Sequence, residues 1–288
     1  MPFGCLDGLN NSHSFDVLLS FERQFKTFSV GVFPSLKENL QPPYQLIPMT
    51  ADTTPFNRRR PLNPGELSAI PWLALLTPAE RDRAVDDLKI TDTSPGEYIC
   101  RTGRPVTYWF GVVDGLLKMS SDNAEGKTMT FTGIPPGGWF GEGTALKREI
   151  YRYNIQALRK SHVAGLHVDT FHWLLDHSIR FNRFVMNQLN ERLGQFIAAR
   201  EIDRMNSPDI RVARSLAALF NPVLYPGVGE VLRITQQELA YLVGLSRQRV
   251  NEALTSLAEE GSIRVEYGGL RVLDLGALRS TRMDKSTA

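Results

Sequence analysis

Residues 234–273 restrict the fold of this chain more than any other stretch, because structural signals follow one another there at close and regular spacing. The stretch reads ITQQELAYLVGLSRQRVNEALTSLAEEGSIRVEYGGLRVL. Thr235 and Glu238 form a T-x-x-E capping box, which predicts a helix from about Gln236. Gly244 follows the apolar stripe of that helix, and glycine tolerates the positive φ of a sharp turn. The first helix is therefore expected to end in a tight turn at this glycine.

A second helix and a β-hairpin are expected after this turn. Ser246 can cap the helix, whose apolar residues repeat at helical spacing until Gly261 ends it. Gly268-Gly269 then separates two runs of alternating apolar residues, which is a strong hairpin signal. Two helices joined by a tight turn and followed by a hairpin form a winged helix-turn-helix, a unit that binds double-stranded DNA.

The start of the second helix carries polar side chains that are suited to reading base edges. Arginine can form two hydrogen bonds with guanine, and glutamine can do the same with adenine. The alternative is an ordinary helix pair with a solvated, charged face. The capping box, the glycine turn, small Ala240 and the hairpin occur together, which favours DNA binding. The predicted DNA-binding residues are Thr235, Gln236, Ser246, Arg247, Gln248, Arg249, Asn251 and Glu252.

Length and composition limit the remaining possibilities. The 288 residues are enough for about two domains and a further segment, and 42% hydrophobic residues support buried cores. A net charge of +2 is too small to indicate nucleic acid by itself, so the DNA prediction depends on local placement. Cys5 and Cys100 offer neither metal spacing nor a disulfide framework, which is typical of a reducing cytoplasm. No apolar run is long enough for a membrane span, no secretory signal is visible, and no catalytic motif is present.

The chain before the helix-turn-helix divides into two unlike parts. Residues 1–68 contain several prolines and the basic run Arg58-Arg59-Arg60, which predicts a mostly irregular N-terminal extension. The three arginines are expected to lie in a solvated linker. The alternative is that they contact DNA phosphates. Residues 69–177 contain short apolar runs punctuated by turns such as Asp114-Gly115 and by closely spaced glycines, which predicts a β-roll.

A long helix is expected over residues 178–206, before the DNA-binding domain at 207–288. Its apolar residues follow heptad spacing, which predicts a seam that packs against another surface. Dimerisation is favoured over packing within one chain, because a β-roll offers little surface for so long a helix. The residues assigned to this seam are Met186, Leu189, Leu193, Phe196 and Arg200.

A β-roll, a long heptad helix and a winged helix-turn-helix in this order resemble the Crp/Fnr family of bacterial transcription regulators. The resemblance covers about residues 70–275. The most specific motif behind the resemblance is ITQQELAYLVGLSRQRVNEAL. The others are Gly96-Glu97-Tyr98-Ile99, Gly103, Val113-Asp114-Gly115 and Gly138-Trp139-Phe140-Gly141-Glu142. The resemblance implies an α+β fold with a double-stranded β-helix, and a homodimer that binds a palindromic operator. It also implies contact with RNA polymerase.

The resemblance also implies an effector site, and here the sequence departs from the family. Members that bind cyclic AMP use a Gly-Glu segment and a later Arg-Ser pair, whose arginine holds the cyclic phosphate. Gly141-Glu142-Gly143-Thr144 matches the first part, but Tyr151-Arg152 stands where Arg-Ser is expected. A shift by one residue would turn Arg152 away from the pocket. Cyclic AMP, another nucleotide such as cyclic di-GMP or cyclic GMP, a different ligand and no ligand are therefore all retained as hypotheses.

Other sensory chemistries are disfavoured. An iron–sulfur cluster held by four thiolates would need more cysteines than the two present. Haem would need a histidine ligand, and isolated histidines such as His162 and His172 are more often structural. The reading helix also departs from the cyclic-AMP-type members, because Gln248 replaces a glutamate and Glu252 a later arginine. A different palindrome is therefore expected.

Two functions remain as hypotheses. The leading one is a dimeric regulator in which an effector in the β-roll repacks the long helices and reorients the reading helices. The alternative is a constitutive DNA-binding regulator whose β-roll serves as a scaffold or a protein-contact domain, which the altered Tyr151-Arg152 pair favours. A regulatory module of an enzyme is a third reading, but no segment supplies a catalytic domain.

Overall fold

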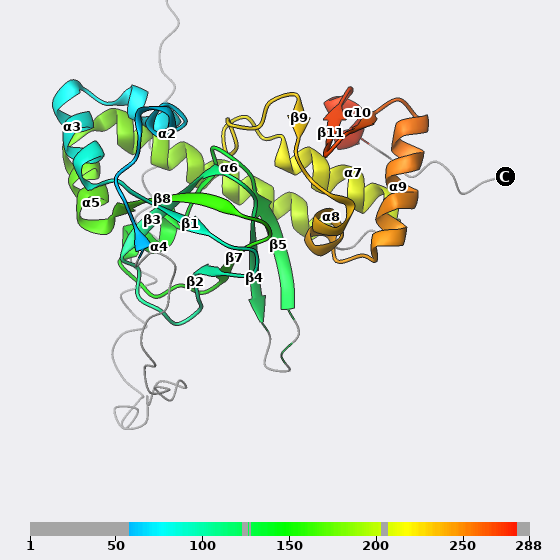
Figure 1. The fold of residues 1–288 in the computed structure, drawn as a ribbon, viewed down its shortest axis with the longest axis horizontal. Coiled ribbons are helices and arrows are strands. Elements are labelled where there is room, and N and C mark those ends of the chain that lie inside the picture. The colour runs from blue at the N-terminus through cyan, green and yellow to red at the C-terminus, as the bar shows by residue number, and fades with distance from the viewer. Residues whose placement is uncertain (1–57, 123–125, 127, 203–206, 281–288) are drawn as a thin grey trace, which may run out of the picture. The chain divides into compact units, whose positions relative to one another are not determined.

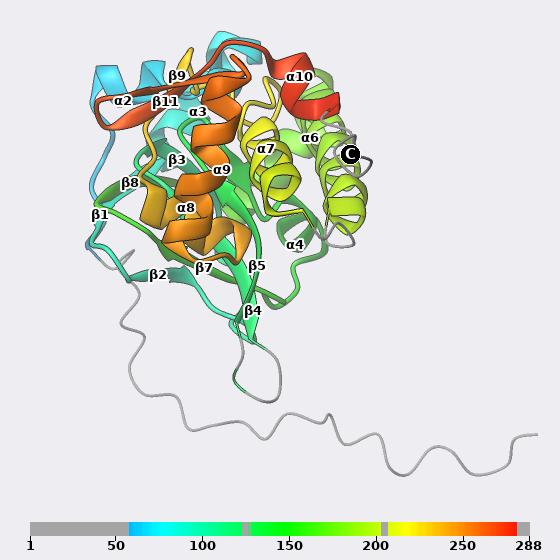
Figure 2. The ribbon, with the colours of Figure 1, turned by 90° about the vertical axis from the view of Figure 1, so that its right-hand side faces the viewer.

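The computed structural model describes residues 58–122, 126, 128–202 and 207–280 (Figure 1; Figure 2 is turned by 90°). A strand-rich domain, one long helix and a helical domain with a hairpin follow one another along these residues. This order confirms the predicted α+β class, with an N-terminal β-roll, a long helix and a C-terminal winged helix-turn-helix.

The β-roll is built from two four-stranded antiparallel sheets within the described residues. One sheet has the strands β1 (Lys89–Thr93), β8 (Ser161–His167), β3 (Tyr108–Asp114) and β6 (Trp139–Phe140), in that order. The other has β2 (Tyr98–Cys100), β7 (Asn154–Ala157), β4 (Leu117–Asp122) and β5 (Thr128–Ile134). Buried side chains of both sheets, among them Trp109 and Ile155, belong to one apolar cluster. The sheets therefore share a core.

An aromatic cluster fastens the long helix α6 (Ile179–Ile202) to this core. The 3-10 helix η2 (Pro71–Leu75) places the fully buried ring of Trp72 among three others. Its ring centroid lies 5.4 Å from Trp109, 5.2 Å from Trp139 and 5.4 Å from Phe181. Because Phe181 belongs to the first turn of α6, the cluster fixes where that helix leaves the β-roll. The domain also contains α3 (Pro78–Asp87), α4 (Glu142–Lys147) and α5 (Val168–His177).

The prediction of an irregular extension over residues 1–68 is wrong for its last part. Helix α2 spans Pro64–Ser68, and Arg60 forms an antiparallel bridge with Ile90 of β1. Asn63 and Glu66 form a reciprocal capping box at the start of α2. Prolines favour irregular structure inside a segment, but Pro64 stands in the first turn of α2, where the fixed φ of proline suits a helix. Residues 1–57 lie outside the described part of the chain.

The DNA-binding domain follows the predicted order of elements. Helix α7 (Pro208–Leu219) leads into α8 (Gln236–Val243) and α9 (Arg247–Glu259). The wing is the hairpin of β10 (Ile263–Glu266) and β11 (Gly269–Val272), which β9 (Val231–Leu232) extends to three strands, and α10 (Leu275–Ser280) follows. Thr235 caps α8 through the expected box with Glu238, and Gly244 has a φ of 66° at the turn. The local signals in this stretch are therefore confirmed.

Close packing in the β-roll leaves no room for a side chain at Gly111. A Cβ atom at Gly111 would lie 2.3 Å from Cε2 of Trp139, inside the aromatic cluster. We expect Gly111→Ala to lower the free energy of unfolding by about 1–3 kcal/mol, because overpacking forces neighbouring side chains out of their rotamers. Urea denaturation measures the loss.

The control is Gly194→Ala in α6, where a Cβ atom would meet nothing within 4 Å. This change should stabilise the protein by about 0.5–1 kcal/mol, since alanine restricts the unfolded chain more than glycine does. An equal change in the free energy of unfolding in both variants would contradict the assigned packing at Gly111.

Candidate DNA interface and effector pocket

The polar face of α9 lies on the surface, above a buried apolar face. Val250, Ala253, Leu254 and Leu257 are buried and hold the helix in the domain. The predicted reading residues Arg247, Gln248, Arg249, Asn251 and Glu252 are all exposed. An exposed row of donors and acceptors at the start of a second helix is the arrangement that reads base edges in the major groove.

Glu252 organises its neighbours on this face. Its Oε1 accepts a hydrogen bond from Nε2 of Gln248 at 3.1 Å, and its Oε2 pairs with Nη1 of Arg249 at 2.7 Å. Arg247 stands at the first position of α9, and Ser246 accepts from the amide of Arg249 at 3.3 Å. The carboxylate therefore sets the orientation of two predicted reading side chains.

A polar contact between predicted DNA-binding residues joins the two helices of the motif. Nε2 of Gln236, at the start of α8, donates to Oδ1 of Asn251 at 2.6 Å. Thr235 is exposed beside it and accepts from the amide of Glu238 at 3.2 Å. The structure thus brings all eight predicted DNA-binding residues to the starts of α8 and α9.

An arginine that the sequence reasoning missed ties this motif to the β-roll. Nε and Nη2 of Arg159, in the turn before β8, donate to the two carboxylate oxygens of Glu238 at 2.8 and 2.6 Å. Nη2 also donates to the carbonyl oxygen of Arg233 at 2.8 Å. Glu238 and Arg159 are separated by 79 residues, and no local pattern relates them. The bidentate pair fixes the start of α8 against the β-roll.

In the predicted effector cassette, the glutamate is bonded inside the protein. Glu142 is 1% exposed at the start of α4, and its Oε1 accepts from Nε of Arg192 at 2.6 Å. Nη2 of Arg192 donates to the carbonyl oxygen of Trp139, also at 2.6 Å. Arg192 lies on α6, so this buried pair joins the cassette to the long helix. The sequence reasoning missed Arg192, although it falls on the same helical face as Phe181 and Val185.

Tyr151, which the resemblance predicts at the position of the phosphate-binding arginine, is buried beside a second aromatic ring. Tyr151 is 3% exposed, and its hydroxyl donates to the carbonyl oxygen of Tyr108 at 2.9 Å. The ring of Tyr153 lies 5.9 Å from it, and both tyrosines approach the place of a Cβ on Gly141. Burial raises the pKa of both phenols, so they stay neutral. These residues do not provide an arginine for a cyclic phosphate.

The remaining cassette residues are Arg152, which precedes strand β7, and the residues at the start of α4. Arg152 is exposed, whereas Tyr151 is buried, and the guanidinium of Arg152 lies 3.2 Å from the carboxylate of Glu149. Gly141 is the N-cap of α4 with a φ of 88°, and Gly143 and Thr144 are in its first turn. Gly141 and Glu142 thus lie at the start of α4, while Arg152 lies on the surface before β7.

The predicted heptad seam divides between two faces of α6. Leu189 and Phe196 are half-buried and pack against the β-roll of the same chain, with the Phe196 ring 6.3 Å from Phe131. Met186 and Leu193 are 61% and 60% exposed, and Arg200 is exposed too. The exposed stripe contains four apolar side chains, namely Ile179, Met186, Leu193 and Ile197.

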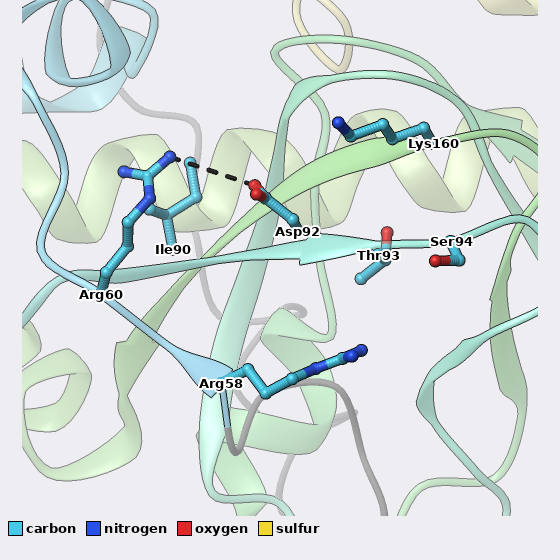
Figure 3. Close-up of a pocket in the computed structure, with 7 residues that line it drawn as sticks. All are labelled: Arg58, Arg60, Ile90, Asp92, Thr93, Ser94 and Lys160. Atoms are coloured by element: carbon cyan, nitrogen blue, oxygen red, sulfur yellow. Dashed lines mark ion pairs between the residues drawn. The ribbon is translucent and has the colours of Figure 1, made fainter.

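Two arginines of the run Arg58-Arg59-Arg60 form ion pairs, one with a carboxylate of the β-roll and one with a carboxylate of α2. Arg58 pairs with Glu97 at 2.8 Å, and Arg60 pairs with Glu66 at 2.6 Å. Arg60 also lies 4.0 Å from Asp92, across a cavity of about 390 Å³ that Lys160 lines as well (Figure 3). Both side chains remain exposed, at 66% and 45%, so these arginines are solvated as expected and also form surface ion pairs.

The buried cysteine and four of the histidines contact polar or apolar groups of the protein itself. Cys100 is buried, and burial raises the pKa of its thiol. His172 Nε2 lies 2.9 Å from the carbonyl oxygen of Ala145, and His177 Nδ1 lies 2.8 Å from that of Trp173. His162 and His167 lie beside carboxylates, those of Asp92 and Asp169. Among the described residues, no three His, Cys, Asp or Glu side chains gather as a metal site would require.

Comparison with known proteins agrees with both halves of this architecture. Residues 91–178 match the cyclic nucleotide-binding domain, and residues 210–281 match the Crp-like helix-turn-helix domain. The transcriptional regulator SdrP of Thermus thermophilus is 30% identical over 174 residues, which cover 59% of this chain and 81% of SdrP. The transcriptional regulator LdrP of the same species is 27% identical over 63% of this chain and 91% of LdrP.

A solved structure shows the same fold. FixK2 from Bradyrhizobium japonicum superimposes with a TM-score of 0.55 at 15% identity, over 70% of this chain and 99% of FixK2. The chain belongs to the Crp/Fnr family of transcription regulators. Within the described residues, no helix combines the length and the apolar character that crossing a bilayer requires.

The buried pair between α4 and α6 generates a prediction about stability. Arg192→Met should lower the free energy of unfolding by about 3–5 kcal/mol, because it leaves the Glu142 carboxylate buried without its partner. Urea denaturation of the full chain measures this loss.

The double variant Glu142→Leu with Arg192→Met is the control. It removes both charges, and we expect it to recover much of the stability, since an apolar pair of similar volume often replaces a buried ion pair without loss. A loss below about 1 kcal/mol in the single variant would show that the pair is not buried as described.

Proposed function

We propose that this protein is a homodimeric transcription regulator in which two copies of α9 read a palindromic operator. The observation that carries the proposal is the exposed polar face of α9 on a motif of the Crp-like type. Arg247 is assigned to guanine, and Gln248 and Glu252 to the bases that set this operator apart from that of the cyclic-AMP-type members. The protein would act in the cytoplasm and contact RNA polymerase, as the family resemblance implies.

The exposed stripe of α6 supports the dimer. Phe181, Val185 and Arg192 are buried on one face of the helix, and Met186 and Leu193 are exposed on another. Apolar residues repeating every seven positions on an uncovered face are typical of a helix that pairs with a copy of itself. Two such helices would place the reading helices about one turn of DNA apart.

We further propose that operator binding does not require a cyclic nucleotide. Support comes from Tyr151, which stands where the resemblance predicts the phosphate-binding arginine and is buried beside Tyr153, and from Glu142, which is bonded to Arg192. The competing function is gating by a nucleotide in the β-roll, which the retained Gly141 and Glu142 favour. Operator affinity measured with and without cyclic AMP, cyclic GMP and cyclic di-GMP distinguishes the two, since only the gated protein responds.

The role of Arg247 can be tested by selecting bound sites from random DNA. Arg247→Ala should weaken binding to the selected site by about 1–3 kcal/mol and relax the base preference at one position of each half-site. Arg101→Ala serves as a control, because Arg101 stacks over Tyr98 in the β-roll, away from α9. An unchanged base preference in the Arg247 variant would contradict its assignment.

The proposed dimer can be tested on the long helix. Leu193→Glu should dissociate the dimer, because each interface would then bury an unpaired carboxylate. Sedimentation equilibrium measures the change in mass. Asn187→Glu adds the same charge at an exposed position outside the stripe and should leave the dimer intact. If both variants have the same mass in sedimentation equilibrium, the interface lies on another surface.

A further inference from the structure

The carboxylate of Glu252 has both of its oxygens engaged within the reading helix α9. Oε1 accepts from Nε2 of Gln248, four residues earlier in the helix, at 3.1 Å. Oε2 pairs with Nη1 of Arg249 at 2.7 Å. Helix α9 lies at the front of Figure 2, and all three side chains are exposed. The protein itself therefore orders these side chains on the surface that is proposed to face DNA.

We propose that Glu252 fixes the side-chain amide of Gln248 in the orientation that reads adenine and rejects guanine. The proposal rests on the proposed function and deepens it, because it names the base that one residue of α9 selects. Glu252 is then a positioning residue, which acts on the choice of base through Gln248.

The chemistry of the carboxylate decides which end of the Gln248 amide faces it. An ionised carboxylate only accepts hydrogen bonds, whereas an amide carries a donating nitrogen and an accepting oxygen. Nε2 of Gln248 can therefore face Glu252, but Oε1 in that place would set two acceptors against each other. The amide oxygen and the second N–H hydrogen stay available to a partner outside the helix.

An amide held in this way matches one purine and not the other. In the major groove adenine offers its N6 amino group as a donor and N7 as an acceptor, which fit the oxygen and the second N–H of Gln248. Guanine offers two acceptors, O6 and N7, so the amide oxygen would meet O6 without a donor between them. A glutamine that rotates freely could turn its nitrogen toward guanine, and the bond to Glu252 opposes that rotation.

The pair with Arg249 makes this role of Glu252 compatible with DNA. The guanidinium holds the second carboxylate oxygen, so the carboxylate is fixed from two sides. Its positive charge also offsets the negative charge that Glu252 would bring near the phosphates. When DNA covers α9 and displaces water, both hydrogen bonds and unpaired polar groups gain weight, which strengthens the discrimination.

The experiment selects bound sites from random DNA with the full chain and compares variants of α9. Gln248→Ala first identifies the base position that Gln248 reads, since the preference should relax there. Fluorescence anisotropy then compares the selected site with a copy that carries guanine instead of adenine at this position of both half-sites. We expect the parent to prefer adenine by about tenfold or more, as a bidentate contact does. If Gln248→Ala relaxes no position, the proposal is wrong.

The decisive variant is Glu252→Met, which keeps an unbranched side chain but removes the acceptor. We expect the preference for adenine over guanine to fall below about threefold, because the amide of Gln248 can then rotate to face either purine. A preference that stays at the parent's value would overturn the proposal.

Glu259→Met is the matched control. Glu259 is exposed at the last position of α9, so the same change removes the same charge at the other end of the helix. Loss of a carboxylate strengthens attraction to phosphates in both variants, but phosphate contacts carry no sequence information. Glu259→Met should therefore keep the parent's base preference, and an equal loss of preference in both variants would refute the role of Glu252.

A double variant distinguishes positioning from direct reading. In the Gln248→Ala background, Glu252→Met should leave the base preference as it is, because the side chain that Glu252 positions has been removed. A further change of base preference in this background would show that Glu252 contacts a base itself, which contradicts the proposal.

This inference and the proposed function fail in different ways. If the parent selects no DNA site, the proposed function fails and the inference fails with it. If the parent selects a palindromic site but Glu252→Met leaves the base preference unchanged, the inference alone is wrong.

Discussion

The buried ion pair of Glu142 and Arg192 determines which face of the long helix α6 is exposed. It lies between α4 and α6, with Nε of Arg192 2.6 Å from the carboxylate and the glutamate almost fully buried. A buried charge is tolerated only beside its partner, so the pair selects one rotation of α6 about its axis. That rotation turns Phe181 and Val185 inward and leaves Met186 and Leu193 on the surface. The face offered to a second copy therefore follows from a contact inside one chain.

Local signals in the sequence predicted the DNA-binding domain well. The capping box of Thr235 with Glu238, the turn at Gly244 and the hairpin at Gly268 each depend on residues a few positions apart. The conformational preferences that produce them act within one turn of helix or one hairpin, so they can be read from a single chain. The exposed face of α9 followed directly from the spacing of its apolar residues.

Contacts between distant residues could not be predicted in the same way. Arg192 reaches Glu142 across 50 positions, and Arg159 reaches Glu238 across 79. Heptad spacing grouped Leu189 with Leu193, although the structure places Leu189 against the β-roll. Periodicity shows that a helix has an apolar side, but which neighbour covers it is decided by the tertiary fold. The helix α2 was missed for a different reason, because prolines can begin a helix as well as interrupt one.

Glu238 belongs to two interactions at once, and this has a consequence for modular engineering of the protein. The carboxylate caps the first turn of α8 and also receives the bidentate bond from Arg159 of the β-roll. A domain-swap chimera that joins this β-roll to a foreign helix-turn-helix would keep Arg159 but lose its acceptor, unless the graft carries an acidic residue at the same helical position. Exchange of DNA-binding domains among such regulators is therefore constrained at a single side chain, however similar the two folds are.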